Sequence, residues 1–221
     1  LSVALFERDL TGRRFQSVED VERHMSGFEG PPEARHGLEQ ALLNLLAESQ
    51  QVEVAALFEG SRPLRYHRLV STRADADGAL RDGVGAIKVK INGRDGDRER
   101  LTAIAEHVRG RCDVLVDANG SIEPKALAQW TSHLASLGVA LLEQPLAPEH
   151  DDMLTNALNV PRPKVVADES CRALEDVERG AALGGVDVIT IKPMLVGGPL
   201  RAIAMGRAAQ KHGMMSIFTH C

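Results

Sequence analysis

The chain has few cysteines and few aromatic residues, and it lacks a long apolar run. Its 221 residues include three cysteines, at positions 112, 171 and 221, with five Phe, one Trp and one Tyr. An odd number of widely spaced cysteines excludes a disulfide framework and a cysteine zinc site, and it favours a reducing, cytoplasmic location. No apolar run reaches the roughly 18 residues that a membrane-spanning helix needs, so we expect no membrane span.

The chain also lacks an excess of positive charge. It carries 31 Asp and Glu against 26 Lys and Arg, a formal net charge of -5. A negative chain with few aromatic rings for base stacking does not suit nucleic-acid binding. The length suits one large domain, or one domain with a small companion. Because the first residue is Leu1 rather than Met, we expect the sequence to start at a fragment boundary.

Short apolar runs recur along the second part of the chain, about one in every 25 residues. They are continuous rather than alternating, as in strands buried on both faces. Helical patterns lie between several of them, and this alternation predicts a parallel sheet with right-handed crossovers. The first two runs are so close that little room is left for a full crossover helix. The runs cover residues 66–71, 86–91, 114–119, 139–145, 164–170, 186–193 and 214–220, and the helical patterns cover 98–109, 123–137 and 200–212.

Seven such repeats predict an α/β fold, a TIM-type (β/α) barrel over residues 61–221 that stops before its eighth strand. An open barrel would expose strand edges, so we expect further segments of the protein outside this sequence. Residues 1–60 carry instead two helical patterns, 17–28 and 33–49, and predict a smaller, mostly helical domain. The predicted apolar stripe of the second pattern consists of Ala34, Leu38, Ala41, Leu42, Leu45 and Leu46.

Charged residues stand near the carboxyl ends of five successive runs, at spacings of 27, 26, 25 and 24 residues: Lys90, Asp117, Glu143, Asp168 and Lys192. One barrel repeat separates each from the next, so all five are expected at one rim, which in barrels is the catalytic face. Three carboxylates there would repel one another unless a cation lay between them. The spacing therefore predicts a site for Mg²⁺, or for Mn²⁺, on Asp117, Glu143 and Asp168.

Lysines flank this predicted metal site. Lys88 and Lys90 are two residues apart and therefore share one face of their strand, the barrel interior. A partly desolvated lysine near other cations has a lowered pKa and is a usable general base. The metal would stabilise the enolate that forms when a proton leaves the carbon next to a carboxylate. Lys-Val-Lys also suits an exposed edge strand, but burying five charges in register without a function would be costly.

The ordered set KVK (88–90), DAN (117–119), EQP (143–145), DES (168–170) and IKP (191–193), followed by Gly197-Gly198, resembles the muconate-lactonizing subgroup of the enolase superfamily. Residues 31–47 resemble the helix that leads from the capping domain of that family into its barrel, so residues 1–60 would be a partial capping domain. The resemblance implies Mg²⁺ ligands at Asp117, Glu143 and Asp168, and a catalytic acid/base at Lys90. It also implies the residues around them: Lys192 on the opposite face, Lys88 beside the substrate carboxylate, and Asn119 and Glu169 orienting the metal ligands, with strand-end capping as an equal alternative for the last two.

Members of this subgroup include o-succinylbenzoate synthases, muconate cycloisomerases, N-succinylamino acid racemases and dipeptide epimerases. The run 192–213 most resembles o-succinylbenzoate synthases, which dehydrate a cyclohexadiene carboxylate in menaquinone synthesis. The expected protein is therefore a Mg²⁺-dependent lyase, or an isomerase of the subgroup, that binds a small carboxylate and is compatible with a homo-oligomer. Two alternatives stay open, a Schiff-base aldolase using Lys192 or Lys90 and a non-catalytic barrel remnant. We expect Cys171 to be a small buried residue.

Overall fold

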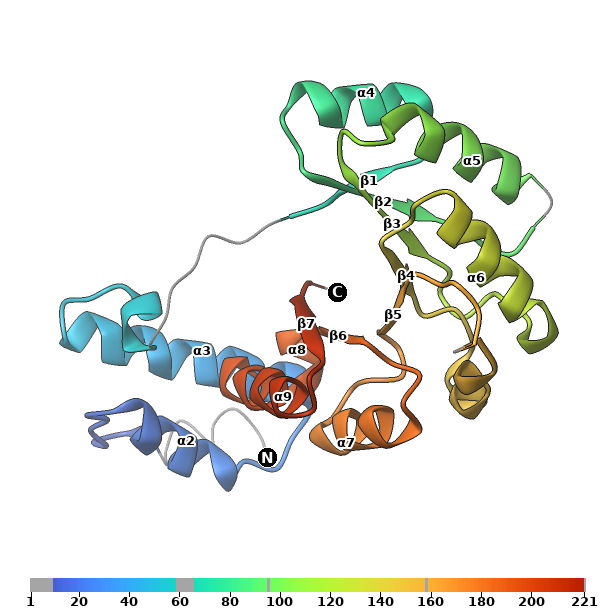
Figure 1. The fold of residues 1–221 in the computed structure, drawn as a ribbon. Coiled ribbons are helices and arrows are strands. Elements are labelled where there is room, and N and C mark those ends of the chain that lie inside the picture. The colour runs from blue at the N-terminus through green and yellow to red at the C-terminus, as the bar shows by residue number, and fades with distance from the viewer. Residues whose placement is uncertain (1–9, 59–65, 95, 158, 221) are drawn as a thin grey trace. The chain divides into compact units, whose positions relative to one another are not determined.

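The computed structural model describes residues 10–58, 66–94, 96–157 and 159–220, and it falls into two compact units (Figure 1). The helical unit comprises Leu1–Pro63, Ile191–Met205 and Phe218–Cys221. The sheet unit comprises Leu64–Thr190 and Gly206–Ile217. The predicted domain boundary between residues 60 and 61 lies outside the described residues.

Seven strands form one sheet in sequential order, from β1 to β7. Neighbouring strands from β1 to β6 are parallel, and the backbone N–H of Met215 in β7 donates to the carbonyl of Asp187 at 3.1 Å. Each strand overlaps the apolar run that predicts it, so the predicted (β/α) barrel architecture is confirmed. The strands are β1 (Arg68–Val70), β2 (Ala86–Lys90), β3 (Asp113–Asp117), β4 (Leu141–Glu143), β5 (Lys164–Ala167), β6 (Val188–Ile191) and β7 (Met215–Phe218).

Helices alternate with these strands. Figure 1 shows α4, α5 and α6 on the same side of strands β1 to β4. From β1 onward the helices are α4 (Arg73–Arg81), α5 (Asp97–Val108), η2 (Pro124–Ala126), α6 (Leu127–Ser136), η3 (Pro148–Ala157), α7 (Leu174–Leu183), α8 (Pro193–Val196) and α9 (Pro199–Lys211).

The expectation that little room is left for a helix between β1 and β2 is wrong, because α4 fits there with nine residues. A capping box starts this helix directly after β1. The Thr72 hydroxyl accepts the N–H of Asp75 at 3.2 Å, and the Asp75 carboxylate accepts the N–H of Thr72 at 2.9 Å. These reciprocal bonds satisfy the first free N–H groups of the helix, so it needs no longer connection.

The main core lies between the strands and their helices. Ile87 and Val89 of β2 are fully buried and belong to the same apolar cluster as Leu101 and Ile104 of α5. Because side chains alternate along a strand, Lys88 lies on the opposite face of the sheet from Ile87 and Val89. The hydrophobic pattern thus directs the polar residues of β2 away from the helices.

The helical unit has a core of its own. The helical unit contains α2 (Val18–Ser26), α3 (Pro32–Ser49), η1 (Val54–Leu57) and α8. No helix among the described residues is both long enough and apolar enough to cross a membrane. The buried residues of this core are Val21, Met25, Leu42, Leu43, Leu46 and Leu200.

The predicted apolar stripe of α3 is partly wrong. Ala34 and Ala41 are exposed, and Leu45 is 60% exposed. Arg35 and Glu39 are buried instead, at 4% and 0% exposure. The helix packs against α8 as well as α2, so its buried face turns toward residues that the apolar pattern does not mark.

Candidate active site

Acidic side chains stand at the ends of three neighbouring strands. Asp117 is the last residue of β3 and pairs in register with Glu143, the last residue of β4. Asp168 follows the end of β5, two residues beyond Val166, which pairs with Glu143. Side chains two residues apart share a face, so the three carboxylates are directed to one side of the sheet. All three are buried, with exposures of 1%, 4% and 7% for Asp117, Glu143 and Asp168.

Two lysines of β2 border these carboxylates. The Nζ atom of Lys88 lies 2.9 Å from Asp117 Oδ2 and 2.9 Å from Glu143 Oε1. Lys90 pairs in register with Asp117, and its Nζ atom lies 3.8 Å from Asp117 Oδ2. The Lys90 side chain is 55% exposed, whereas that of Lys88 is 15% exposed. Lys88 therefore pairs with two of the three buried acids, and Lys90 is accessible from solvent.

The charges of this cluster shift the pKa values of its members. Burial alone would lower the pKa of Lys88, but the carboxylates of Asp117 and Glu143 outweigh it and raise the pKa. This is the reverse of the lowering expected for a lysine beside other cations. Burial raises the pKa of Glu143, the nearby carboxylates of Asp117 and Asp168 raise it further, and Lys88 opposes them. Lys88 thus offsets only part of the effect that burial and the neighbouring acids have on the pKa of Glu143.

The donor set of the cluster fits a hard divalent cation, because all three acids offer the carboxylate oxygens that Mg²⁺ prefers. Within the described ranges, no three His, Cys, Asp or Glu side chains are close enough together to hold a metal ion as they stand. Lys88 contacts both Asp117 and Glu143, and binding of an ion there requires its ammonium group to move aside. The metal site on these residues stays a prediction.

Asn119 and Glu169 connect the ends of β3 and β5. The N–H of Asn119 donates to Asp117 Oδ1 at 3.0 Å, and its side-chain amide donates to Glu169 Oε1 at 3.1 Å. Asn119 has a left-handed backbone, with φ +42°, which turns its side chain toward the neighbouring loop. The other oxygen of Glu169, Oε2, is buried and accepts no hydrogen bond from the described residues. These contacts go beyond capping of one strand end, and the predicted orienting role stays a prediction.

Gln144 is a buried residue of this region that the sequence did not single out. Its side-chain amide bonds to the backbone at Asp168 and at Ser170, across the strand boundary. The hydroxyl of Ser170 in turn donates to Asp151 of η3 at 2.9 Å. A sequence signal for Gln144 was its place between Glu143 and Pro145, but its contacts depend on loops that the pattern does not describe.

Lys192 belongs to the helical unit, where it precedes α8. Further along the same segment, the carbonyl of Gly197 accepts from the Arg35 guanidinium, which also pairs with Glu39 Oε2 at 2.6 Å. Glu39 Oε1 accepts the N–H of Leu200 at 2.7 Å. The segment after Lys192 is thus held on α3, while the position of Lys192 opposite Lys90 stays a prediction.

Cys171 is buried, at 4% exposure, as expected for a small core residue. Burial and the Asp176 carboxylate raise the pKa of its thiol to about 12, so the thiol stays protonated at neutral pH.

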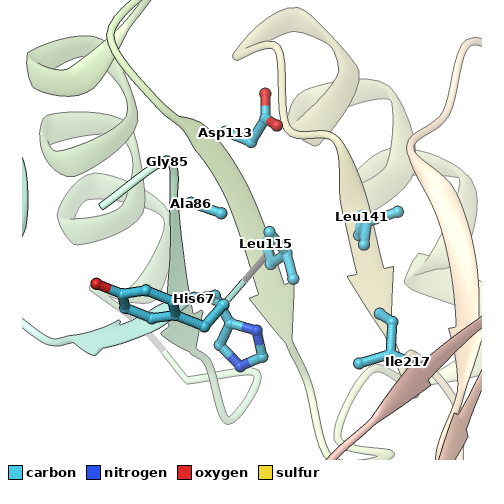
Figure 2. Close-up of a pocket in the computed structure, with 8 residues that line it drawn as sticks. His67, Gly85, Ala86, Asp113, Leu115, Leu141 and Ile217 are labelled. Carbon is cyan, nitrogen blue, oxygen red and sulfur yellow. The ribbon is translucent and has the colours of Figure 1, made fainter. Parts of the chain in front are cut away.

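A separate cavity of about 310 Å³ lies on the face of the sheet that carries the three carboxylates, toward the amino-terminal ends of the strands. Figure 2 shows Leu115, Leu141 and Ile217 as its apolar lining, with His67 at one side. Burial lowers the pKa of His67, and the ammonium group of Lys88 lowers it further. Because none of the predicted metal ligands lines it, this cavity is distinct from the acidic cluster.

Comparison with known proteins identifies the family to which the fold belongs. Residues 71–221 match the family described as enolase C-terminal domain-like. The chain belongs to this family. An o-succinylbenzoate synthase from Bacillus subtilis (strain 168) is 27% identical over 222 residues, which cover 95% of this chain and 57% of that protein. An L-Ala-D/L-Glu epimerase from Escherichia coli (strain K12) is 33% identical over 188 residues, which cover 81% of this chain and 57% of that protein.

Solved structures of the enolase superfamily share the fold. The muconate lactonizing enzyme from Pseudomonas putida has a TM-score of 0.82 at 21% identity and matches 90% of this chain and 60% of that one. An L-Ala-D/L-Glu epimerase has a TM-score of 0.80 at 28% identity and matches 98% of this chain and 67% of that one. Together with the family match and the o-succinylbenzoate synthase relatives, these structures confirm the resemblance to the muconate-lactonizing subgroup. The chain spans a little more than half the length of the two curated relatives named above.

Proposed function

We propose that the protein carrying this chain is a Mg²⁺-dependent lyase that removes the α-proton of a small carboxylate and then eliminates water, as in o-succinylbenzoate synthesis. The observation that supports this most directly is the row formed in register by Lys90, Asp117 and Glu143. It joins an accessible amine to buried acids at the carboxyl ends of barrel strands, where active sites of this architecture lie. The o-succinylbenzoate synthase that aligns along 95% of the chain favours the dehydration.

Asp117, Glu143 and Asp168 would hold the metal ion. When bound, Mg²⁺ supplies positive charge that stabilises the negative charge developing on the substrate carboxylate. Lys88 binds the same carboxylate, because its raised pKa keeps its ammonium group charged. Asn119 and Glu169 orient the acids from the loops after β3 and β5.

Lys90 carries the proton. Its Nζ atom takes the α-proton as general base, and the same group then donates that proton to the departing hydroxyl. Water leaves, a carbon–carbon double bond forms, and Lys90 returns to its starting state. The family resemblance implies that Lys192 stabilises the charge of the enolate.

The deciding experiment follows exchange of the substrate α-proton in D₂O by NMR. Lys90→Ala is expected to lower the exchange rate by about 10²- to 10⁴-fold, because the general base is lost. Binding of Mn²⁺ is expected to survive, because Lys90 is not a metal ligand. Lys125→Ala serves as the matched control, since the Lys125 side chain is 85% exposed and pairs only with Glu123 among the ion pairs of the described residues. Exchange at the control rate in Lys90→Ala would exclude Lys90 as the base.

Epimerisation of a dipeptide is the second candidate, favoured by the 33% identity to the L-Ala-D/L-Glu epimerase. It uses the same first proton transfer but returns a proton to carbon. Measuring turnover of the o-succinylbenzoate precursor and, separately, of dipeptide substrates distinguishes the two reactions. Borohydride trapping of a carbonyl substrate on a lysine would instead support the aldolase, and metal binding without any turnover would support the non-catalytic remnant.

A further inference from the structure

The side-chain amide of Gln144 is buried, at 2% exposure, and all of its hydrogen-bonding capacity is used. Its Oε1 atom accepts the backbone N–H of Asp168 at 2.9 Å and that of Ser170 at 3.1 Å. Its Nε2 atom donates to the carbonyl of Leu146 at 2.7 Å and to Ser170 Oγ at 2.7 Å. A primary amide offers two acceptor lone pairs and two N–H groups, so none is left over.

These bonds begin where the sheet ladder between β4 and β5 ends. The backbone N–H of Gln144 still donates to the carbonyl of Val166 at 2.8 Å, as in the ladder. One step further, the side chain of Gln144 replaces the backbone as the partner of Asp168. Gln144 also has a left-handed backbone, with φ +38°, a conformation that costs a non-glycine residue free energy and persists only where its surroundings enforce it.

The same residue reaches the loop after β3. The carbonyl of Gln144 accepts the N–H of Gly120 at 2.7 Å, three residues after Asp117. On the other side, Ser170 Oγ donates to Asp151, and Arg179 donates to the carbonyl of Ser170 at 2.8 Å. Gln144 therefore bonds to the segments that follow two of the acidic residues and is itself the neighbour of the third.

We propose that Gln144 is a positioning residue for the metal site: its Oε1 atom fixes the backbone at Asp168, so that the carboxylates of Asp168 and Glu143 reach one ion. This rests on the proposed metal site, and Gln144 itself does not touch the ion. An uncharged amide suits the place, because it supplies acceptors and donors without adding a fourth negative charge to the acids. Groups that orient metal ligands in this way typically contribute about 10- to 100-fold in metal affinity.

The test measures the Mn²⁺ dissociation constant and the electron paramagnetic resonance spectrum of bound Mn²⁺ in the whole protein. Gln144→Met keeps the approximate size but removes every side-chain hydrogen bond, and it is expected to weaken Mn²⁺ binding about tenfold or more and to broaden the spectrum. Gln144→Glu keeps the Oε1 acceptor for both N–H groups and loses the two donors. It is expected to bind Mn²⁺ no more weakly than the unmodified protein, although its melting temperature falls.

A purely structural role predicts a different result, in which both variants lose thermal stability and the folded fraction of each binds Mn²⁺ as before. Gln129→Glu controls for the added charge, because Gln129 is exposed on α6 and its Oε1 atom accepts from Arg98. If Gln144→Met does not fold, Gln144→Asn replaces it, since its shorter amide does not reach the two N–H groups.

Unchanged Mn²⁺ affinity in Gln144→Met or Gln144→Asn, or equal weakening in Gln144→Glu, would overturn the positioning role and leave the proposed function standing. An unmodified protein that binds no Mn²⁺ would overturn the proposed function and this role together.

Discussion

Glu39→Ala tests how strongly the segment after Lys192 is held. Glu39 and Arg35 form an ion pair on α3 whose side chains are 0% and 5% exposed. Burial is the main influence on the pKa of Arg35 and lowers it, while the charge of Glu39 opposes this effect. Glu39 also accepts the N–H of Leu200, and Arg35 donates to the carbonyl of Gly197. The substitution therefore leaves a buried guanidinium without its counter-ion and one backbone N–H without its acceptor.

Breaking one side of a buried ion pair costs about 3–5 kcal/mol, because the remaining charge stays desolvated. The lost acceptor for Leu200 overlaps with this cost, so we expect a loss of about 3–5 kcal/mol in the free energy of unfolding. Replacing both partners, Arg35→Met with Glu39→Leu, is expected to cost less than Glu39→Ala, because no charge of this pair stays buried and only the N–H of Leu200 and the carbonyl of Gly197 lose their partners. Urea unfolding followed by circular dichroism measures the free energy of unfolding of the unmodified protein, the single variant and the double variant.

Glu178→Ala is the matched control on the surface. Glu178 pairs with His212 at 2.7 Å, with side chains 58% and 37% exposed, and such pairs contribute at most about 1 kcal/mol. A loss for Glu39→Ala no larger than that of the control would refute the reasoning. So would a double variant as unstable as the single one, because the cost would then not come from the unpaired charge.

Two further substitutions test the loops near the candidate site. Gly120 has φ +74°, and a Cβ atom there would lie 3.1 Å from Ala147 Cα. Gly83 has a similar φ of +71°, but no atom lies within 4 Å of the Cβ position. Gly120→Ala should therefore lower the free energy of unfolding in urea more than Gly83→Ala does. Gly83→Ala is expected to cost about 1–2 kcal/mol from backbone strain alone, and equal losses would contradict the steric part of this account. Burial alone would raise the pKa of Asp97, but Arg100 and the N–H groups of Asn92 and Arg94 outweigh it and hold the pKa below the ordinary 3.8. Asp97 thus contributes stability that is present above pH 3.8 and is lost as the pH falls through its lower folded-state pKa. Asp97→Asn should therefore flatten the acid dependence of the free energy of unfolding. The fluorescence of the single Trp follows the unfolding. An unchanged acid dependence would exclude this role for Asp97.

The strands and the order of the charged residues were readable from the chain, because parallel strands buried on both faces are continuous apolar runs. The even spacing of Lys90, Asp117 and Glu143 then placed them at one edge of the sheet. The helix α4 was missed, because it has only nine residues and buries only Ala76 and Ala79, so it shows no long apolar stripe. The buried face of α3 was misplaced, because the packing partner and not the helix itself decides which face is covered.

Sequence alone therefore determined the barrel architecture and the residues that stand at the strand ends, since these depend on periodic burial along the chain. The ordered motifs at those strand ends carried the family resemblance. Only the tertiary structure decided which groups these residues contact: Lys88 on two carboxylates, Gln144 on the backbone at Asp168, and Arg35 on Gly197, 162 residues away. Such contacts depend on left-handed residues in the loops and on segments that meet only after folding. Local patterns carry no record of either, because they describe how often side chains are buried and not which partner each one finds.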